Sequence, residues 1–230
     1  MEERRIRYLQ TMGITPWLLR GRNDDDAVEA APANPDPETE AGIAGMGWEL
    51  LRKTALECRR CPLNESRTRV VFGVGSHSAD WLFVGEAPGA EEDRRGEPFV
   101  GRAGQLLDAM LHALELDRER AYIANVLKCR PPGNRDPLPE EAATCAPFLN
   151  RQIELIQPKV IVAVGRVAAQ RLLDSDTPVG RLRGKIYPYG ERRTPLVVTY
   201  HPAYLLRRPG EKAKAWKDLV LAKSACQTTT

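Results

Sequence analysis

Four short apolar segments alternate with helical patterns along this chain of 230 residues, and that alternation most limits how the chain can fold. Each segment has the length and apolar composition of a buried strand. Strands that alternate with helices form right-handed crossovers around a parallel sheet, with helices on both faces. We therefore expect an α/β fold, a three-layer α/β/α sandwich with a central, mostly parallel sheet of about four strands. The predicted strands are 81–87, 121–128, 159–165 and 196–200, and the predicted helices are 101–115, 139–156, 166–173 and 211–225.

The stretch 81–108 is the most unusual part of this pattern. Its apolar run breaks at Gly85 into a loop with three further glycines, two prolines and seven charged residues, after which a helical pattern resumes. Open α/β sheets place their sites outside the carboxyl ends of the strands. A long surface turn is the alternative, but solubility alone does not require so many special backbone residues beside acidic and aromatic side chains. The side chains in question are Glu86, Glu92, Asp93 and Phe99.

Net charge is +3, but it is unevenly distributed along the chain. Residues 1–45 hold five arginines against nine acidic residues and so carry −4, which leaves +7 on the remainder. A basic body suits a polyanionic partner such as nucleic acid, although a mildly basic enzyme without such affinity is the alternative. There is no apolar run of about 18 residues and no signal-peptide core at the N-terminus, so we expect a cytoplasmic protein.

The N-terminal part divides into two segments by composition. Residues 1–22 form a short amphipathic, tryptophan-bearing segment, which we interpret as a partner-docking peptide. Residues 23–45 are acidic, rich in proline and alanine, and almost free of large apolar groups, so we predict a disordered linker. The main domain is then expected over residues 46–230.

Five cysteines are present, and four of them form two pairs. Cys58 and Cys61 form a C-x2-C pair before a proline, and Cys129 and Cys145 flank a Pro/Gly-rich turn. Four thiolates from two segments are typical of a zinc or an iron–sulfur site, and spacing does not choose between these metals. Buried cysteines that act as small apolar residues are the alternative. Cys226, in a polar tail, is interpreted as a spare thiol.

Two further segments lie where the predicted strands end. Asn125 falls within the second predicted strand, where it would either share the crevice beside Glu86 or be a hydrogen-bonded core residue. His201 follows the last predicted strand, and the loop after it carries leucines and then two arginines. Such a loop suits contact with a nucleic-acid groove. The chain has no Walker-type phosphate loop, no G-x-S-x-G motif and no dinucleotide fingerprint after its central strand.

Together these segments resemble the family 4 uracil-DNA glycosylases, the iron–sulfur branch of the uracil-DNA glycosylase superfamily. The resemblance covers roughly residues 48–225 and is carried by three motifs and the four cysteines. The motifs are GEAPGAEEDRRGEPFVGRAGQLLD, YIANVLKCRPPGNRDP and HPAYLLR. It implies a uracil-DNA glycosylase-like fold and a base excision repair enzyme, which flips uracil out of DNA and hydrolyses its N-glycosidic bond.

The resemblance also implies roles for individual residues. Phe99 would stack on uracil and Asn125 would read its N3–H and O4 edge. Glu86 and His201 would be catalytic, with Asp93 as the alternative acid. The pocket lining would be completed by Ala87, Pro88, Glu92 and Asp93, and the DNA contacts would come from Arg135, Leu205, Leu206 and Arg207. A structural [4Fe-4S] cluster, with zinc as the alternative, would bind Cys58, Cys61, Cys129 and Cys145.

Other functions remain open at this stage. A relative that bonds covalently to DNA carries a basic insertion with a reactive histidine, where this chain reads CRPPGNRDP, so a turnover enzyme is favoured. A non-turnover protein that binds uracil or lesion DNA with the same fold is the main alternative. A zinc-containing nucleotide-binding α/β protein is the other. We expect a monomer that is associated with a bacterial nucleoid and not with a membrane.

The N-terminal peptide lies outside this resemblance and has one of its own. YLQTMGITPWLLR, residues 8–20, looks like the docking peptide of the psi subunit of the bacterial replicative clamp loader. That peptide binds the chi subunit, so the resemblance implies that these residues tether the protein to the replication fork.

Overall fold

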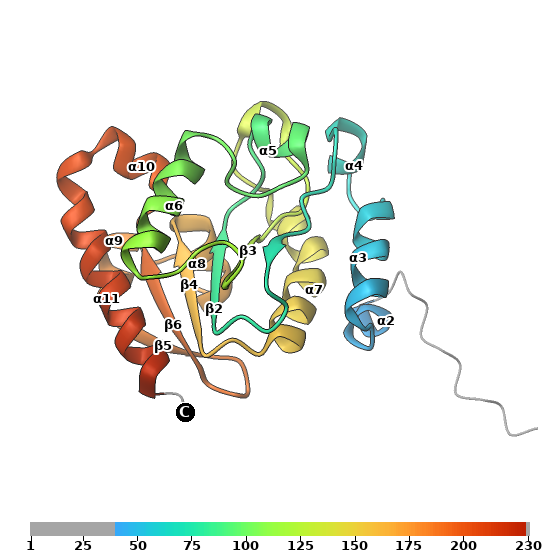
Figure 1. Ribbon diagram of the computed structural model, residues 1–230. Helices are drawn as coiled ribbons and strands as arrows, with labels where there is room; N and C mark the ends of the chain where they lie inside the picture. Colours follow the sequence, from blue (N-terminus) through green and yellow to red (C-terminus); the bar gives the residue numbers. More distant parts are fainter. Residues whose placement is uncertain (1–39, 229–230) are drawn as a thin grey trace, which may run out of the picture. The chain divides into compact units, whose positions relative to one another are not determined.

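A six-stranded sheet forms the centre of the protein, as seen in a computed structural model that describes residues 40–228 (Figure 1). The strand order is β1-β3-β2-β4-β6-β5. The four inner strands are parallel, and the two edge strands pair antiparallel with their neighbours. The bounds are β1 Val74–Gly75, β2 Trp81–Gly85, β3 Ala121–Asn125, β4 Val160–Val164, β5 Ile186–Tyr189 and β6 Thr194–Thr199. The four inner strands are those expected from the sequence; the two edge strands were not predicted.

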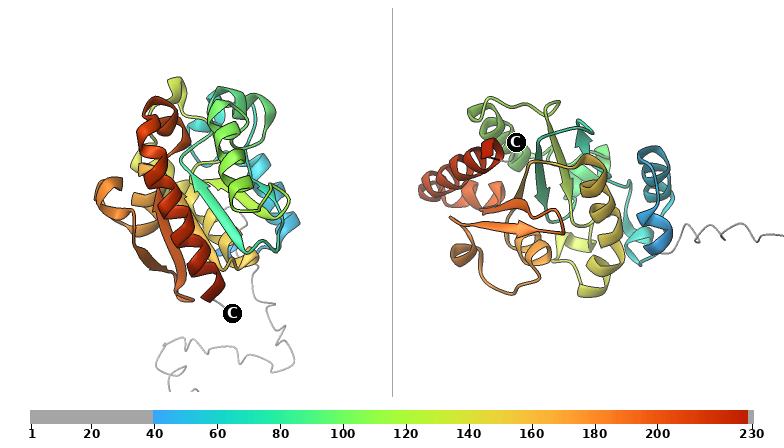
Figure 2. Two further views of the ribbon diagram at one scale, coloured as in Figure 1. Left: turned by 60° about the vertical axis from the view of Figure 1, so that its left-hand side comes forward. Right: turned by 90° about the horizontal axis from the view of Figure 1, so that it is seen from below.

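Helices cover both faces of the sheet (Figures 1 and 2). One face packs against α6 and α11 through Leu107, Leu111 and Leu219. The other packs against α7 and α8, for example through Leu149 and Ala168. Burial on both sides explains why every residue of β2, β3 and β4 is buried and why nearly all of them are apolar, with Asn125 at the end of β3 as the polar exception. The helices are α2 Glu40–Ala44, α3 Trp48–Glu57, α4 Leu63–Ser66, α5 Ala90–Arg95, α6 Arg102–Ala113, α7 Pro139–Ile156, α8 Arg166–Leu173, α9 Val179–Leu182, α10 Pro202–Arg207 and α11 Lys212–Thr228, with 3-10 turns at Pro132–Asn134 and Pro209–Glu211.

The predicted linker, 23–45, extends too far at its C-terminal end. Glu40–Ala44 is helical, and Ile43 is fully buried in a cluster with Met46, Leu51 and Phe148. The polar composition of residues 23–45 predicted disorder, but burial of the Ile43 side chain holds the end of this segment against the domain. The rest of the linker and the docking peptide, residues 1–22, lie outside the described residues. Within residues 40–228, every helix is too short or too polar to cross a lipid bilayer.

The strand order places a topological switch point beside β2. From β2 the chain passes through α6 to β3 on one side, and from β3 it passes through α7 to β4 on the other side of β2. These crossovers run in opposite directions, so their helices lie on opposite faces and leave a crevice at the carboxyl ends of the strands. The sheet thus dictates where a ligand site can form.

Candidate active site

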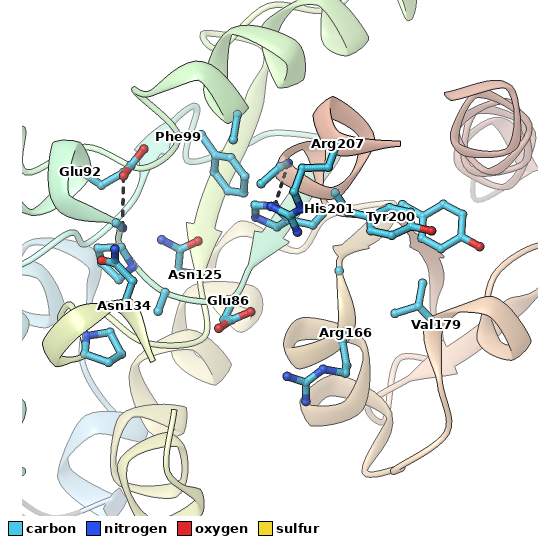
Figure 3. Close-up of a pocket in the computed structure, with 18 of the residues that line it drawn as sticks. Glu86, Glu92, Phe99, Asn125, Asn134, Arg166, Val179, Tyr200, His201 and Arg207 are labelled. Carbon is cyan, nitrogen blue, oxygen red and sulfur yellow. Dashed lines mark hydrogen bonds between the residues drawn. The ribbon is translucent and has the colours of Figure 1, made fainter. Parts of the chain in front are cut away.

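A cavity of about 920 Å³ lies at this carboxyl edge. Glu86 follows β2, Asn125 ends β3, Gly165 follows β4 and His201 comes two residues after β6, and all four line it. Phe99, from the loop between α5 and α6, completes the group, and its ring lies beside Asn125 and His201 in Figure 3. Four loops that are distant in the sequence thus converge on one space, as expected.

Glu92 holds the long loop after β2 together. Its carboxylate accepts hydrogen bonds from the backbone N–H groups of Gly89, Val100 and Gly101, at 3.1, 2.9 and 3.1 Å. These bonds join the two ends of the segment that carries Phe99. Hydrogen bonds to an ionised acceptor are strong, so one side chain fixes the whole segment against the cavity. Glu92 lines the cavity as predicted, but its contacts are those of a positioning residue.

The backbone of Phe99 adopts a left-handed conformation, φ +54°, which a bulky residue rarely takes. Arg118 stabilises it by donating hydrogen bonds to the carbonyl oxygens of Pro98, at 3.0 Å, and of Phe99. Gly104 leaves room for the same carbonyl, because a Cβ there would lie 1.6 Å from the Phe99 oxygen. The unusual backbone thus has specific support, which aims a buried ring at the cavity.

A glycine lets the aromatic ring and the amide approach each other. Gly85 pairs with Asn125 across β2 and β3. A Cβ on Gly85 would lie 2.4 Å from Asn125 Oδ1 and 2.6 Å from the Phe99 ring. Beyond these strands the backbone pairing continues, since Val126 and Leu127 donate to the carbonyls of Gly85 and Glu86, both at 3.0 Å. Asn125 therefore stands on a rigid ladder next to the ring.

His201 is neutral near pH 7, and its tautomer follows from one contact. Its Nδ1 accepts a hydrogen bond from the backbone N–H of Ala203 at 3.1 Å. Burial lowers its pKa to about 4, and the charge of Arg207 acts in the same direction, while Glu92 opposes it. A neutral imidazole that accepts at Nδ1 carries its proton on Nε2. The Nε2–H is thus a hydrogen-bond donor, and the ring lies 5.5 Å from that of Phe99, centroid to centroid.

Glu86 lines the cavity, and within residues 40–228 its carboxylate forms no hydrogen bond or ion pair with another side chain. Burial raises the pKa of Glu86, and the nearby charge of Asp136 raises it further, whereas Arg166 opposes this shift. Arg166 and Asp136 form an ion pair at 2.5 Å beside it. A carboxylate with a raised pKa is a stronger base, which suits it to orient and deprotonate water.

Three of the predicted site residues, Asp93, Leu205 and Leu206, do not line the cavity. Asp93 is 3% exposed, and its Oδ1 accepts hydrogen bonds from the backbone N–H groups of Thr68 and Arg69. It therefore ties α5 to the preceding segment and is not available as the alternative acid. Leu205 is 1% exposed in the core and cannot contact DNA there, whereas Leu206 is 37% exposed.

The remaining predicted residues lie on the cavity wall or close to it. Ala87 and Pro88 form the wall beyond Glu86. Arg135 and Arg207 also line the cavity, and Arg135 binds Glu141 through two hydrogen bonds, at 2.9 and 2.6 Å.

The four paired cysteines lie near one another around the start of the loop after β3. Burial raises the pKa of Cys129 and that of Cys145, the latter to about 12, and the charge of Cys58 raises both further. Cys61 and Cys129 interact in the same way. Arg67 donates to Cys129 Sγ at 3.0 Å, and the Lys128 N–H donates to Cys145 Sγ at 3.3 Å. Among the described residues, no trio of His, Cys, Asp or Glu is close enough for a single metal ion.

Several residues at the site were not predicted. Arg166 and Tyr200 line the cavity. Each stands at the carboxyl end of a predicted strand, and that position alone could have marked them as candidates for the site. Gly165 has φ +98°, and a Cβ there would lie 3.0 Å from His201 Cβ. Arg118 and Arg67 act on the site from outside it, and no sequence motif distinguishes them from other surface arginines.

Comparison with known proteins agrees with this geometry. The profile of the Uracil DNA glycosylase superfamily matches residues 72–223. A type-4 uracil-DNA glycosylase of Archaeoglobus fulgidus is 50% identical over 160 residues, 67% of this chain and 80% of that protein. The type-4 uracil-DNA glycosylase of Thermotoga maritima is 44% identical over 180 residues, which are 76% of this chain and 93% of that protein. That of Sulfurisphaera tokodaii is 42% identical over 168 residues, which are 70% of this chain and 76% of that protein. The chain therefore belongs to the uracil-DNA glycosylase superfamily and, within it, to the type-4 uracil-DNA glycosylases.

Proposed function

We propose that this DNA repair glycosylase hydrolyses the N-glycosidic bond of uracil in DNA with Glu86 and His201 as its catalytic residues. The observation that carries the assignment is the convergence of an acid, a ring, an amide and an imidazole on one cavity. Uracil reaches such a cavity only when it is flipped out of the base stack, and the product is an abasic site.

Phe99 and Asn125 would bind the extruded base. The ring of Phe99 offers a stacking face, held in place by its supported backbone. The Asn125 amide carries both an acceptor for the uracil N3–H and a donor for O4. Cytosine presents an acceptor and a donor at the same positions, so each pairing would become repulsive. This inversion accounts for selection of uracil.

His201 and Glu86 would stabilise the two charges that form as the bond breaks. When the bond from the sugar C1′ to the base N1 breaks, its electron pair leaves with uracil. The Nε2–H of neutral His201 can donate to uracil O2, where the negative charge develops. Glu86 can stabilise the positive sugar and accept a proton from the water whose oxygen bonds to C1′.

Residues at the cavity mouth would hold the DNA. Arg135 and Arg207 line the cavity and can contact phosphates. Leu206, which is exposed on α10 next to Arg207, is suited to fill the gap that the flipped base leaves. Leu205 has no part in this proposal.

The four cysteines fit a [4Fe-4S] cluster, which would be structural. Their thiols lie close enough to affect one another's pKa, but not close enough in any trio for one metal ion. A cluster is larger than an ion and takes more widely spaced thiolates, which favours it over zinc. Hydrogen bonds from Arg67 and from the Lys128 N–H would stabilise the thiolates. The cluster would pin the loop after β3 that carries Arg135.

The role of the N-terminal peptide rests on its sequence alone. Its resemblance to the psi peptide supports the proposal that residues 8–20 bind the chi subunit of the clamp loader. A pull-down with chi should lose this chain when Trp17 is changed to alanine, and binding that ignores the change would refute the proposal. Location in the bacterial cytoplasm at the nucleoid stays a prediction.

An oligonucleotide assay tests the catalytic proposal. Strands with a single uracil are incubated with the protein and then with alkali, and scission at the abasic site is measured against matched cytosine and thymine strands. We expect scission of the uracil strand only, lost in Glu86→Ala and His201→Ala but retained in Arg120→Ala. Asn125→Asp should lower uracil release relative to cytosine release. Uracil-specific binding without scission would instead favour the non-turnover protein.

A further inference from the structure

The cavity is larger than a single pyrimidine ring requires. Its volume of about 920 Å³ is near the upper end of the range, roughly 300–1,000 Å³, that accommodates drug-sized ligands. The residues proposed to bind uracil occupy one part of it. A second part, lined by Pro178, Val179, Gly180, Tyr200 and Tyr204, has no role in the reaction described above. In Figure 3, Tyr200 and Val179 lie on the opposite side of His201 from Phe99 and Asn125.

Two tyrosines form an aromatic pair in this second part. The ring centroids of Tyr200 and Tyr204 are 4.9 Å apart, with the ring planes tilted by 34°. Both rings line the cavity and are partly exposed. Gly180 lies against the pair, since a Cβ there would be 3.8 Å from the Tyr200 hydroxyl. Ring surface is therefore available to a flat ligand that enters from the uracil side.

The pair is held by a buried ion pair behind it. The Arg183 guanidinium lies 5.4 Å from the Tyr200 ring centroid. It donates to both carboxylate oxygens of Asp218, at 3.0 and 2.9 Å, and to the Lys214 carbonyl at 2.6 Å. The Asp218 side chain is only 1% exposed, so this arrangement is fixed by α11. The guanidinium holds the Tyr200 ring in place but also covers part of it, and Tyr204 packs against the same ring, so a flat ligand would stack on Tyr204 with Tyr200 as its support.

The chemistry of this lobe matches a nucleobase. Its five lining residues carry no charge, while Arg207 and Arg166 line the same cavity and can hold the adjoining phosphates. Stacking on tyrosine tolerates any base, because every base has a flat face. We propose that Tyr200 and Tyr204 form a second nucleobase subsite, which stacks an unpaired base adjacent to the flipped uracil in the same strand. This inference rests on the proposed function, because it places uracil beside Phe99 and Asn125.

A single-stranded substrate is the direct probe, since its neighbouring bases are free to stack. Uracil release is measured as kcat/KM for two oligonucleotides, one with normal bases on both sides of uracil and one with abasic analogues there. Base–aromatic stacking predicts that loss of the neighbouring bases lowers kcat/KM about 5- to 150-fold for the native protein. Tyr204→Leu, which keeps apolar volume but removes the ring, should lose a similar factor on the normal strand and respond little to the abasic neighbours.

Two control variants separate stacking from general damage. Tyr204→Phe keeps the ring and should keep the sensitivity to abasic neighbours that Tyr204→Leu loses. Trp216→Ala removes an aromatic side chain that is 42% exposed outside the cavity, and should leave both rates unchanged. If the native protein is indifferent to the abasic neighbours, or if Tyr204→Leu is as sensitive to them as the native protein, the subsite is refuted.

A fluorescence measurement makes the result independent of turnover. A 2-aminopurine placed next to uracil is quenched when it stacks, so the native protein should quench it and Tyr204→Leu should not. Uracil release without quenching would overturn the subsite and leave the proposed function intact. Quenching without uracil release would overturn the proposed function and leave the subsite intact.

Discussion

The protonation state of His201 gives a demanding test of the site. Burial and Arg207 lower its pKa from the ordinary 6.5 to about 4. At pH 6 a histidine of pKa 6.5 is roughly three quarters protonated, whereas one of pKa 4 is only about 1% protonated. The hydrogen bond that Nδ1 accepts from Ala203 requires the neutral form. We therefore expect His201 to stay neutral from pH 7 down to about pH 5.

Nuclear magnetic resonance can follow this group directly, because the chain has only three histidines. One imidazole resonance should keep its neutral shift down to about pH 5, and it should be the one absent from His201→Gln. Arg207→Ala should raise the pKa of that group, because it removes a positive charge that opposes protonation. A His201 resonance that titrates near pH 6.5 in the native protein would refute both the tautomer and the proposed donor role.

The same shift affects stability, with a definite sign. The unfolded chain binds a proton at His201 near pH 6.5, while the folded chain resists protonation until about pH 4. Stability from this group is therefore complete above pH 6.5 and falls as the pH drops toward 4, by about 3 kcal/mol in all. Chemical unfolding between these pH values should show the loss in the native protein and a smaller loss in His201→Gln. Equal losses would contradict the assigned pKa.

Three other predictions concern Glu86, the support of Phe99 and the four paired cysteines. Glu86→Gln should lower kcat about 10²- to 10⁴-fold with little change in KM. It should also remove the fall in rate at acid pH, since Glu86 is protonated at a higher pH than His201 as the pH is lowered. The same fall in rate in Glu86→Gln would contradict this assignment. Arg118→Ala should lower kcat/KM about 10- to 100-fold, because it frees the backbone of Phe99, whose ring is proposed to stack on uracil. Arg120→Ala, on the same turn, should leave kcat/KM unchanged, and equal losses in the two variants would refute a positioning role for Arg118. If the proposed cluster is present, the purified native protein should be brown and Cys145→Ser should lose that colour; a colourless native protein would refute the cluster, and a brown Cys145→Ser protein would refute Cys145 as one of its ligands.

Much of the fold could be predicted because its signals are local. The helices α7 and α8 match the predicted bounds, 139–156 and 166–173, since Pro139 opens the first and Gly165 precedes the second. The edge strands β1 and β5 were missed for a physical reason. β1 has two residues, and β5 contains Pro188 and has no buried residue, so neither shows the apolar pattern of an inner strand.

The errors in the site come from helices that were not predicted. Successive residues of a helix point about 100° apart. On α5, Glu92 faces the cavity, so Asp93 next to it must face elsewhere, and it binds the segment 68–69. On α10, the buried Leu205 and the exposed Leu206 differ in the same way. Once both segments are known to be helical, it follows that Asp93 does not face the cavity with Glu92 and that Leu205 is not exposed with Leu206. When the segments are taken as loops, the sequence cannot distinguish the two residues of either pair.

The short segment between Asn125 and Cys129 has a consequence for fidelity. Only three residues separate the amide that would discriminate the base from a thiol that would bind iron, and two of them are hydrogen-bonded to the strand end that carries Glu86. Movement of Cys129 would therefore act directly on the two backbone hydrogen bonds that Val126 and Leu127 form next to Asn125. Oxidative damage to the cysteines should therefore first appear as errors in which base is excised, while the apolar sheet still keeps the molecule folded.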